Sequence, residues 1–147
     1  MGIQGALEIP SQLSRIDGVG KEVLSIITAQ GYDTNSLFFI RLALDEALIN
    51  AVKHGNCNDP KKSITVEYEI DPQIIRLTVT DMGQGFDHTA LDDPTDPENL
   101  DRSHGWGVLL IREYMDEVHY NSRGNQLTMV YRRGSPQHRR PKLLDDD

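Results

Sequence analysis

The chain has 147 residues, 37% of them hydrophobic and 26% charged, which fits a single soluble globular domain with a core of its own. A net charge of −8 argues against a broad basic surface for nucleic acid, and no apolar run approaches the ~20 residues that cross a bilayer. The N-terminus lacks the pattern of a signal peptide, so we expect a cytoplasmic protein without direct nucleic-acid or membrane partners. The single cysteine, Cys57, excludes an internal disulfide and a thiolate metal cluster.

Two helices are expected in the first third of the chain. Apolar residues recur at helical spacing from 11 to 30, where Ser11 is a candidate N-cap and Gly31 a candidate stop. The second helix is expected from about 35 to 53. Its apolar face is formed by Leu44, Leu48 and Ala51.

Strands are expected on both sides of a long central segment. Strict alternation predicts strands at Ser63–Ile70 and Ile74–Thr80, joined through Asp71-Pro72 as an antiparallel hairpin. The segment 82–104 is poor in apolar residues, and a loop of this length is usually functional. A helix then begins near 105–108 and ends near 115. Two last strands, 117–121 and Gln126–Arg132, meet across Arg123-Gly124-Asn125.

This order of elements is not a regular alternation of strands and helices. It predicts an α+β fold, a two-layer α/β sandwich with helices on one face of a mixed, largely antiparallel sheet. We expect one domain over residues 1–147, with a core of about 7–132. Residues 133–147 are expected to form a flexible tail, because basic residues and then three aspartates crowd there.

Three segments carry residues suited to chemistry. On the second helix, Glu46 and Asn50 are four residues apart and project from one face, which Lys53 joins. Such a pair alone is usually a solvated polar face. Its functional interpretation is a carboxylate that takes a proton beside an amide oxygen that holds Mg²⁺, a cation that prefers oxygen ligands.

The second segment, 80–86, places Asp81, Gly83 and Gly85 after an apolar strand. Aspartate and glycine are common in turns, but they also provide an acceptor carboxylate beside a backbone that a ligand can approach closely. In the third segment, Gly105 and Gly107 precede an apolar helix. They serve either as an entry turn or as free N–H groups for phosphate oxygens.

Together, these segments resemble in order and spacing the N box and the two glycine boxes of the GHKL ATPases, the superfamily of gyrase, heat-shock chaperones and histidine kinases. Segments 93–100 and 111–118 are similar, more narrowly, to the anti-sigma serine kinases of that superfamily. The resemblance covers nearly the whole chain, from about Leu7 to Arg132. It departs at His104 and Trp106, where that branch often carries an arginine in or beside the second glycine box.

The resemblance implies a Bergerat-type site for ATP. At the adenine end, Asp81 would accept a hydrogen bond from the amino group of the base. Gly83 would allow the base to approach closely, and Gly85 would begin a lid.

At the phosphate end, the resemblance implies that Asn50 holds Mg²⁺, which bridges the phosphates. Gly105 and Gly107 would present backbone N–H groups to the phosphates. Glu46 would act as the general base on the attacking hydroxyl. Phosphoryl transfer depends mainly on positioning and charge neutralisation, which these groups supply.

The implied function is an anti-sigma regulatory factor with ATP-dependent protein serine/threonine kinase activity. It would phosphorylate a small anti-anti-sigma partner of the STAS type and sequester a sigma factor, with a homodimer as one possible assembly. The alternatives are a nucleotide-gated module that binds a regulator without phosphorylating it and a stand-alone ATPase that uses water as nucleophile. A histidine-kinase catalytic fragment is disfavoured by the short lid. Glu46 favours catalysis, because pure binding needs no base.

Overall fold

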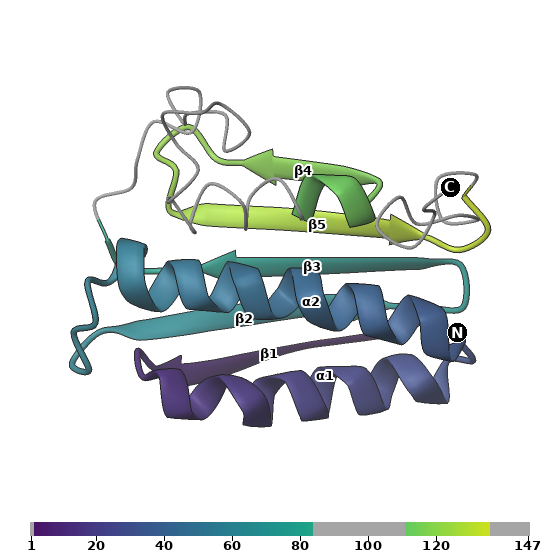
Figure 1. The fold of residues 1–147 in the computed structure, drawn as a ribbon, viewed down its shortest axis with the longest axis horizontal. Coiled ribbons are helices and arrows are strands. Elements are labelled where there is room, and N and C mark those ends of the chain that lie inside the picture. Colours follow the sequence, from purple (N-terminus) through teal and green to yellow (C-terminus); the bar gives the residue numbers. More distant parts are fainter. Residues whose placement is uncertain (1, 84–110, 136–147) are drawn as a thin grey trace, which may run out of the picture.

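The computed structural model describes residues 2–83 and 111–135, which form two layers, with helices covering one face of a sheet (Figure 1). The predicted α+β sandwich is therefore confirmed. The elements in chain order are β1 (Ile3–Pro10), a 3₁₀ turn η1 (Leu13–Arg15), α1 (Ile16–Ala29), α2 (Thr34–Asn50), a π-helical turn η2 (Ala51–Gly55), β2 (Ser63–Ile70), β3 (Ile74–Thr80), β4 (Glu117–Tyr120) and β5 (Gln126–Arg132). A short helical segment, residues 111–114, precedes β4.

The five-stranded sheet has the order β1-β2-β3-β5-β4, and each of its four neighbouring pairs is antiparallel. The register sets apolar partners opposite each other, such as Val66 opposite Val79 and Leu77 opposite Met129. The predicted bounds of β2, β3 and β5 are confirmed, and β4 ends one residue before the predicted 121. Strict alternation specifies both the existence of these strands and their register.

Strand β1 is the element that the sequence did not predict. It lies at the edge of the sheet and pairs with β2 along its whole length. Its inward side chains are only partly buried, and one of the inward positions is a glycine. A Cβ at Gly5 would meet the ring of Tyr68, with Cε1 only 3.1 Å away, so the glycine makes room for an aromatic side chain on β2. An alternation interrupted by glycine gives too weak a signal to predict a strand.

The predicted N-cap at Ser11 is wrong. Ser11 follows β1 directly, and its backbone N–H donates to the carbonyl of Lys62 at 3.0 Å. Helix α1 begins only at Ile16, after the η1 turn, and Arg15 occupies its N-cap position without a side-chain cap. The predicted stop is confirmed, because Gly31 follows the helix with a φ of 92°, a left-handed conformation that glycine adopts without strain.

Helix α2 carries the apolar face expected from the sequence. Leu44 and Leu48 are fully buried and Ala51 nearly so. They pack in one core with side chains from α1 and from the helix-facing side of the sheet, including Val23, Ile27, Ile64, Val66, Leu77 and Met129. At its N-terminus the Asp33 carboxylate accepts a 2.8 Å hydrogen bond from Ser36 N, a strong cap. In residues 2–83 and 111–135, no helix is both long and apolar enough to cross a bilayer.

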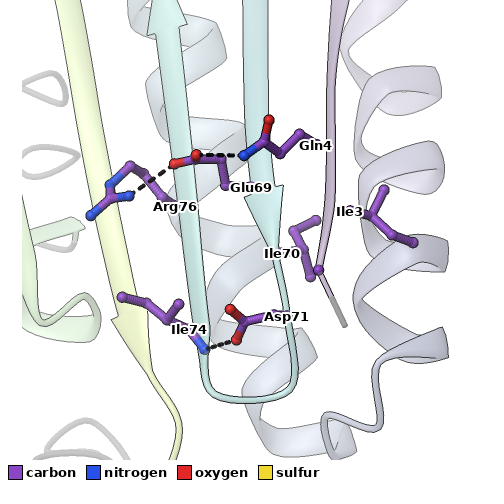
Figure 2. A pocket seen from close by; sticks show the side chains of 8 residues that line it. Ile3, Gln4, Glu69, Ile70, Asp71, Ile74 and Arg76 are labelled. Carbon is purple, nitrogen blue, oxygen red and sulfur yellow. Dashed lines mark hydrogen bonds and ion pairs between the residues drawn. The ribbon is translucent and has the colours of Figure 1, made fainter.

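The opposite face of the sheet is mostly polar, although Val130 on β5 is buried there. Figure 2 shows a hollow at its β1 side, where the Glu69 carboxylate on β2 accepts hydrogen bonds from Gln4 on β1 at 3.0 Å and from Arg76 on β3 at 2.8 Å. These side-chain hydrogen bonds connect three strands on the side of the sheet away from the helices. An antiparallel sheet with one buried and one hydrated face explains the alternation in the sequence.

The core fixes the position of α2, so shortening one of its buried side chains should destabilise the whole domain. Leu48→Ala is expected to lower the free energy of unfolding by about 2–5 kcal/mol, because it removes buried methyl groups and leaves a cavity. Leu13→Ala is the matched control, since Leu13 is 47% exposed. Chemical denaturation of both variants provides the measurement, and equal losses would contradict this account of the core.

Candidate functional site

Several of the chemically suited residues lie at one end of the molecule. The C-terminal end of α2 with η2, the C-terminal end of β3 and the turn between β4 and β5 all lie at the left of Figure 1. Antiparallel pairing of β3 with β5 accounts for this, because the last residue of β3, Thr80, is paired with the first residue of β5, Gln126. The site is therefore built from segments far apart in the sequence.

Glu46 and Asn50 lie one helical turn apart near the end of α2, and both are half-buried rather than solvated. Burial raises the pKa of the Glu46 carboxyl, and the neighbouring negative charge of Asp45 raises it further. The positive charge of Lys53 in η2 opposes this shift. A carboxyl group with a raised pKa is a better proton acceptor once ionised, as a general base requires.

The helix changes its pitch directly after Asn50. Residues Ala51–Gly55 form a π-helical turn, in which Asn56 N donates to Ala51 O at 2.8 Å, five residues back. Cys57 and Asn58 then follow with φ angles of 54° and 59°. A π turn inside a helix often marks a functional site, and two consecutive left-handed residues turn the chain sharply toward β2. This geometry carries Gly55 to the end of β3.

The carboxylate of Asp81, just after β3, lies against Gly55 and Gly83. A Cβ added at Gly55 would stand 2.7 Å from Asp81 Oδ1 and closer still to its other carboxylate atoms. A Cβ at Gly83 would stand 2.7 Å from the carbonyl carbon of Gly55 and would overlap its oxygen. The two backbones approach so closely that a side chain at either glycine would fill the space around Asp81. We call this arrangement of Gly55 and Gly83 around the Asp81 carboxylate the glycine cradle.

Hydrogen bonds from two other segments fix the backbone of residues 81–83. Asn56, fully buried, accepts from Met82 N at 2.7 Å through its side-chain oxygen. The β4–β5 turn holds the other side: Asp81 N donates to Asn125 O at 2.9 Å, and Asn125 Nδ2 donates to Asp81 O at 3.1 Å. Arg123 Nη2 donates to Gly83 O at 3.1 Å. The turn is therefore held on both sides.

Burial raises the pKa of the Asp81 carboxyl, so the fold places this group where its charge is costly. Three weaker effects act in the opposite direction: Gly83 N donates to Asp81 Oδ1 at 2.8 Å, and the charges of Arg123 and Lys62 favour the ionised form. Within the described residues, Asp81 Oδ2 has no hydrogen-bond partner. A half-buried acceptor that is still accessible fits a donor supplied by a ligand, such as the amino group of a purine.

The structure thus brings Asp81 and Gly83 together with the end of the helix that carries Glu46 and Asn50. The other predicted site residues, Gly85, Gly105 and Gly107, lie outside the described residues, as do His104 and Trp106. Of the tail predicted over 133–147, the structure describes only residues 133–135.

Sequence reasoning missed the residues that hold the 81–83 turn in place: Gly55, Asn56, Arg123 and Asn125. Gly55 closes the first motif segment, and Arg123 and Asn125 lie in a predicted turn. The place of Gly55 at the end of a motif segment could have identified it as a site residue. No sequence feature could have identified Asn56, because its neighbours in the sequence do not reveal that its side chain is buried.

Comparison with known proteins identifies the family of this chain. The family model described as "Histidine kinase-like ATPase domain" matches residues 9–131. The anti-sigma F factor of Geobacillus stearothermophilus is 37% identical over 102 residues, covering 67% of this chain and 68% of the relative. The anti-sigma F factor of Anoxybacillus flavithermus is 32% identical over 125 residues, covering 82% and 84%. The serine-protein kinase RsbW of Staphylococcus epidermidis is 28% identical over 132 residues, covering 84% and 83%.

The chain therefore belongs to the histidine kinase-like ATPase family, in the branch of the anti-sigma factors and serine-protein kinases.

The glycine cradle yields a direct test of the site. Gly83→Ala is expected to displace the Asp81 turn and to destabilise the protein, because its Cβ has no room beside the Gly55 backbone. Gly18→Ala is the matched control: it lies within α1 with nothing within 4 Å of the added Cβ, and should stabilise the protein by about 0.5–1 kcal/mol. Thermal unfolding of the two variants measures both effects. Similar stability changes would contradict the close approach described above.

Proposed function

We propose that this protein is an anti-sigma regulatory factor that binds ATP with Mg²⁺ and transfers phosphate to a serine or threonine of a protein partner. The observation that carries the proposal is the Asp81 carboxylate, which lies half-buried against two glycines and has one oxygen without a hydrogen-bond partner among the described residues. The names of its relatives, anti-sigma F factor and serine-protein kinase, support the regulatory and kinase parts of the proposal.

At the adenine end, Asp81 accepts from the amino group of the base, and the absence of a side chain at Gly83 lets the base lie close to the backbone. Gly85, two residues further along the chain, is the residue at which the proposed lid begins. The fixed backbone of residues 81–83 supports this role, because a pre-organised acceptor binds without the cost of ordering it first.

At the phosphate end, Asn50 offers a side-chain oxygen to Mg²⁺, and Gly105 and Gly107 offer backbone N–H groups to phosphate oxygens. When bound, Mg²⁺ neutralises charge on the phosphates. The position of Asn50, one turn after Glu46 and at the start of the π turn, sets the amide and the carboxylate on the same stretch of helix.

Glu46 takes the proton of the partner's hydroxyl as that oxygen attacks the terminal phosphate of ATP, whose bond to the bridging oxygen breaks so that ADP leaves. Its half-buried position and raised pKa support this role. The partners proposed are a small anti-anti-sigma protein of the STAS type, which receives the phosphate, and a sigma factor, which is sequestered.

The proposed adenine contact predicts opposite changes in binding and in stability for Asp81→Asn. The amide is close in shape to the carboxylate and can still accept from Gly83 N, but its NH₂ group repels the adenine amino group. Calorimetry with Mg-ATP should therefore show binding by the wild type and none by the variant, while the exposed Glu67→Gln controls for the lost charge. Unchanged ATP affinity in Asp81→Asn would remove Asp81 from the pocket.

The same variant should be at least as stable as the wild type at neutral pH. The raised pKa of Asp81 means that the folded state binds this proton more tightly than the unfolded state does. The wild type therefore loses stability as the pH rises through that pKa, whereas the asparagine variant does not. Thermal unfolding without nucleotide should show a gap that favours the variant at pH 7 and closes at low pH.

The proposed base predicts that Glu46→Gln retains ATP binding but transfers phosphate at least about 10²-fold more slowly. The wild-type rate should fall as the pH drops through the raised pKa of Glu46, and the variant should lack this dependence. The assay uses radiolabelled ATP with a STAS-type anti-anti-sigma acceptor, and the exposed Glu22→Gln serves as control. Equal rates in Glu46→Gln and wild type would remove Glu46 from the mechanism, whereas ATP binding without any transfer by the wild type would leave the protein as a nucleotide-gated binding module.

A further inference from the structure

We propose that Arg123, on the turn between β4 and β5, is a positioning residue that holds the Asp81–Gly83 turn in the shape that accepts adenine. This inference rests on the proposed function, since it assigns a role within the same nucleotide site. Arg123 lies outside the three segments that the sequence singled out. Its side chain reaches the end of β3 from a turn 40 residues further along the chain.

The contact is specific to the last residue of the turn. Arg123 Nη2 donates to Gly83 O at 3.1 Å, whereas Asn125 of the same turn binds both backbone groups of Asp81. The side chain of Asn56 accepts from Met82 N, so each residue from 81 to 83 has its own hydrogen bond to a neighbouring segment. Arg123 is the charged group in this set, and hydrogen bonds from charged donors are stronger than those between neutral groups.

The β4–β5 turn has backbone hydrogen bonds of its own that do not involve the Arg123 side chain. The Asn121 side-chain oxygen accepts from Gly124 N at 2.7 Å, from Asn125 N at 3.1 Å and from Gln126 N at 3.3 Å. This fan of hydrogen bonds from one asparagine organises the turn, as asparagine side chains commonly do. The Arg123 side chain is thus presented on a turn that is already shaped.

Arg123 also acts on the charge of Asp81. The carboxylate is partly buried, and the groups whose charges favour its ionised form are Arg123 from the β4–β5 turn and Lys62 from the segment before β2. Removing the guanidinium should therefore raise the pKa of Asp81 further, an effect that a purely structural contact would not have. The two effects, on geometry and on charge, can be separated by substitution.

The experiment compares three variants in two measurements. Arg123→Gln loses the charge, Arg123→Lys keeps the charge but loses the planar guanidinium, and Arg76→Gln is a control that loses a charge and one hydrogen bond on the far face of the sheet. The first measurement follows the pKa of Asp81 by carbon NMR of its carboxyl group in nucleotide-free protein. The second measures Mg-ADP affinity by calorimetry from pH 5 to 8.

We expect Arg123→Gln to raise the pKa of Asp81. The pH below which the Mg-ADP affinity falls should rise by the same amount. Its affinity at neutral pH should fall about fivefold, the usual effect of losing one hydrogen bond. Arg123→Lys should restore the pKa but not the full affinity. Arg76→Gln should match the wild type in both measurements.

One outcome would overturn the role of Arg123 and leave the proposed function intact. In that outcome Arg123→Gln has the same Asp81 pKa and the same Mg-ADP affinity as the wild type, while Asp81→Asn abolishes binding. If the wild type bound no adenine nucleotide, both proposals would fall. If Arg123→Gln unfolded, the pKa and the affinity of Arg123→Lys would decide, because a wild-type affinity in that variant would also overturn the role of the guanidinium.

Discussion

The close approach of two backbones, at Gly55 and Gly83, is the constraint on which the site depends. These glycines bring the end of the α2–η2 helix against the end of β3, with the Asp81 carboxylate half-buried beside them. The sheet fixes one partner through the register of β3, and the core fixes the other through the buried face of α2. A side chain at either position would separate the helix from the strand, and the site would no longer exist as a single surface.

This arrangement places a carboxylate where its own charge is costly. Burial raises the pKa of Asp81, and the cost is tolerated because neighbouring segments supply partial compensation through Gly83 N, Arg123 and Lys62. Such a balance is typical of a binding site, where an acceptor that lacks some of its hydrogen bonds within the protein receives them from the ligand. Under the proposed adenine contact, stability and recognition are opposed at this one residue.

The sequence predicted what depends on local pattern. Strict alternation determines β2, β3 and β5, and the position of Asp81 and Gly83 directly after an apolar strand identified the turn that holds the carboxylate. The sequence did not predict β1, because Gly5 interrupts the alternation there. The prediction of Ser11 as an N-cap was wrong, because the helix begins five residues later. Sequence reasoning also missed Asn56 and Arg123, because their roles arise from contacts 26 and 40 residues away along the chain. No window of neighbouring residues contains that information.

The π turn after α2 has a consequence for how this site tolerates change. A helix of uniform pitch would lock the phase of Gly55 to that of Leu48, so any repacking of the core would swing the glycine away from the strand. The wider turn from Ala51 to Gly55 shifts that phase, so that Ala51 and Val52 stay in the core while Gly55 faces the strand. A local change of pitch thus lets one continuous stretch of helix serve both the hydrophobic interior and the surroundings of the carboxylate.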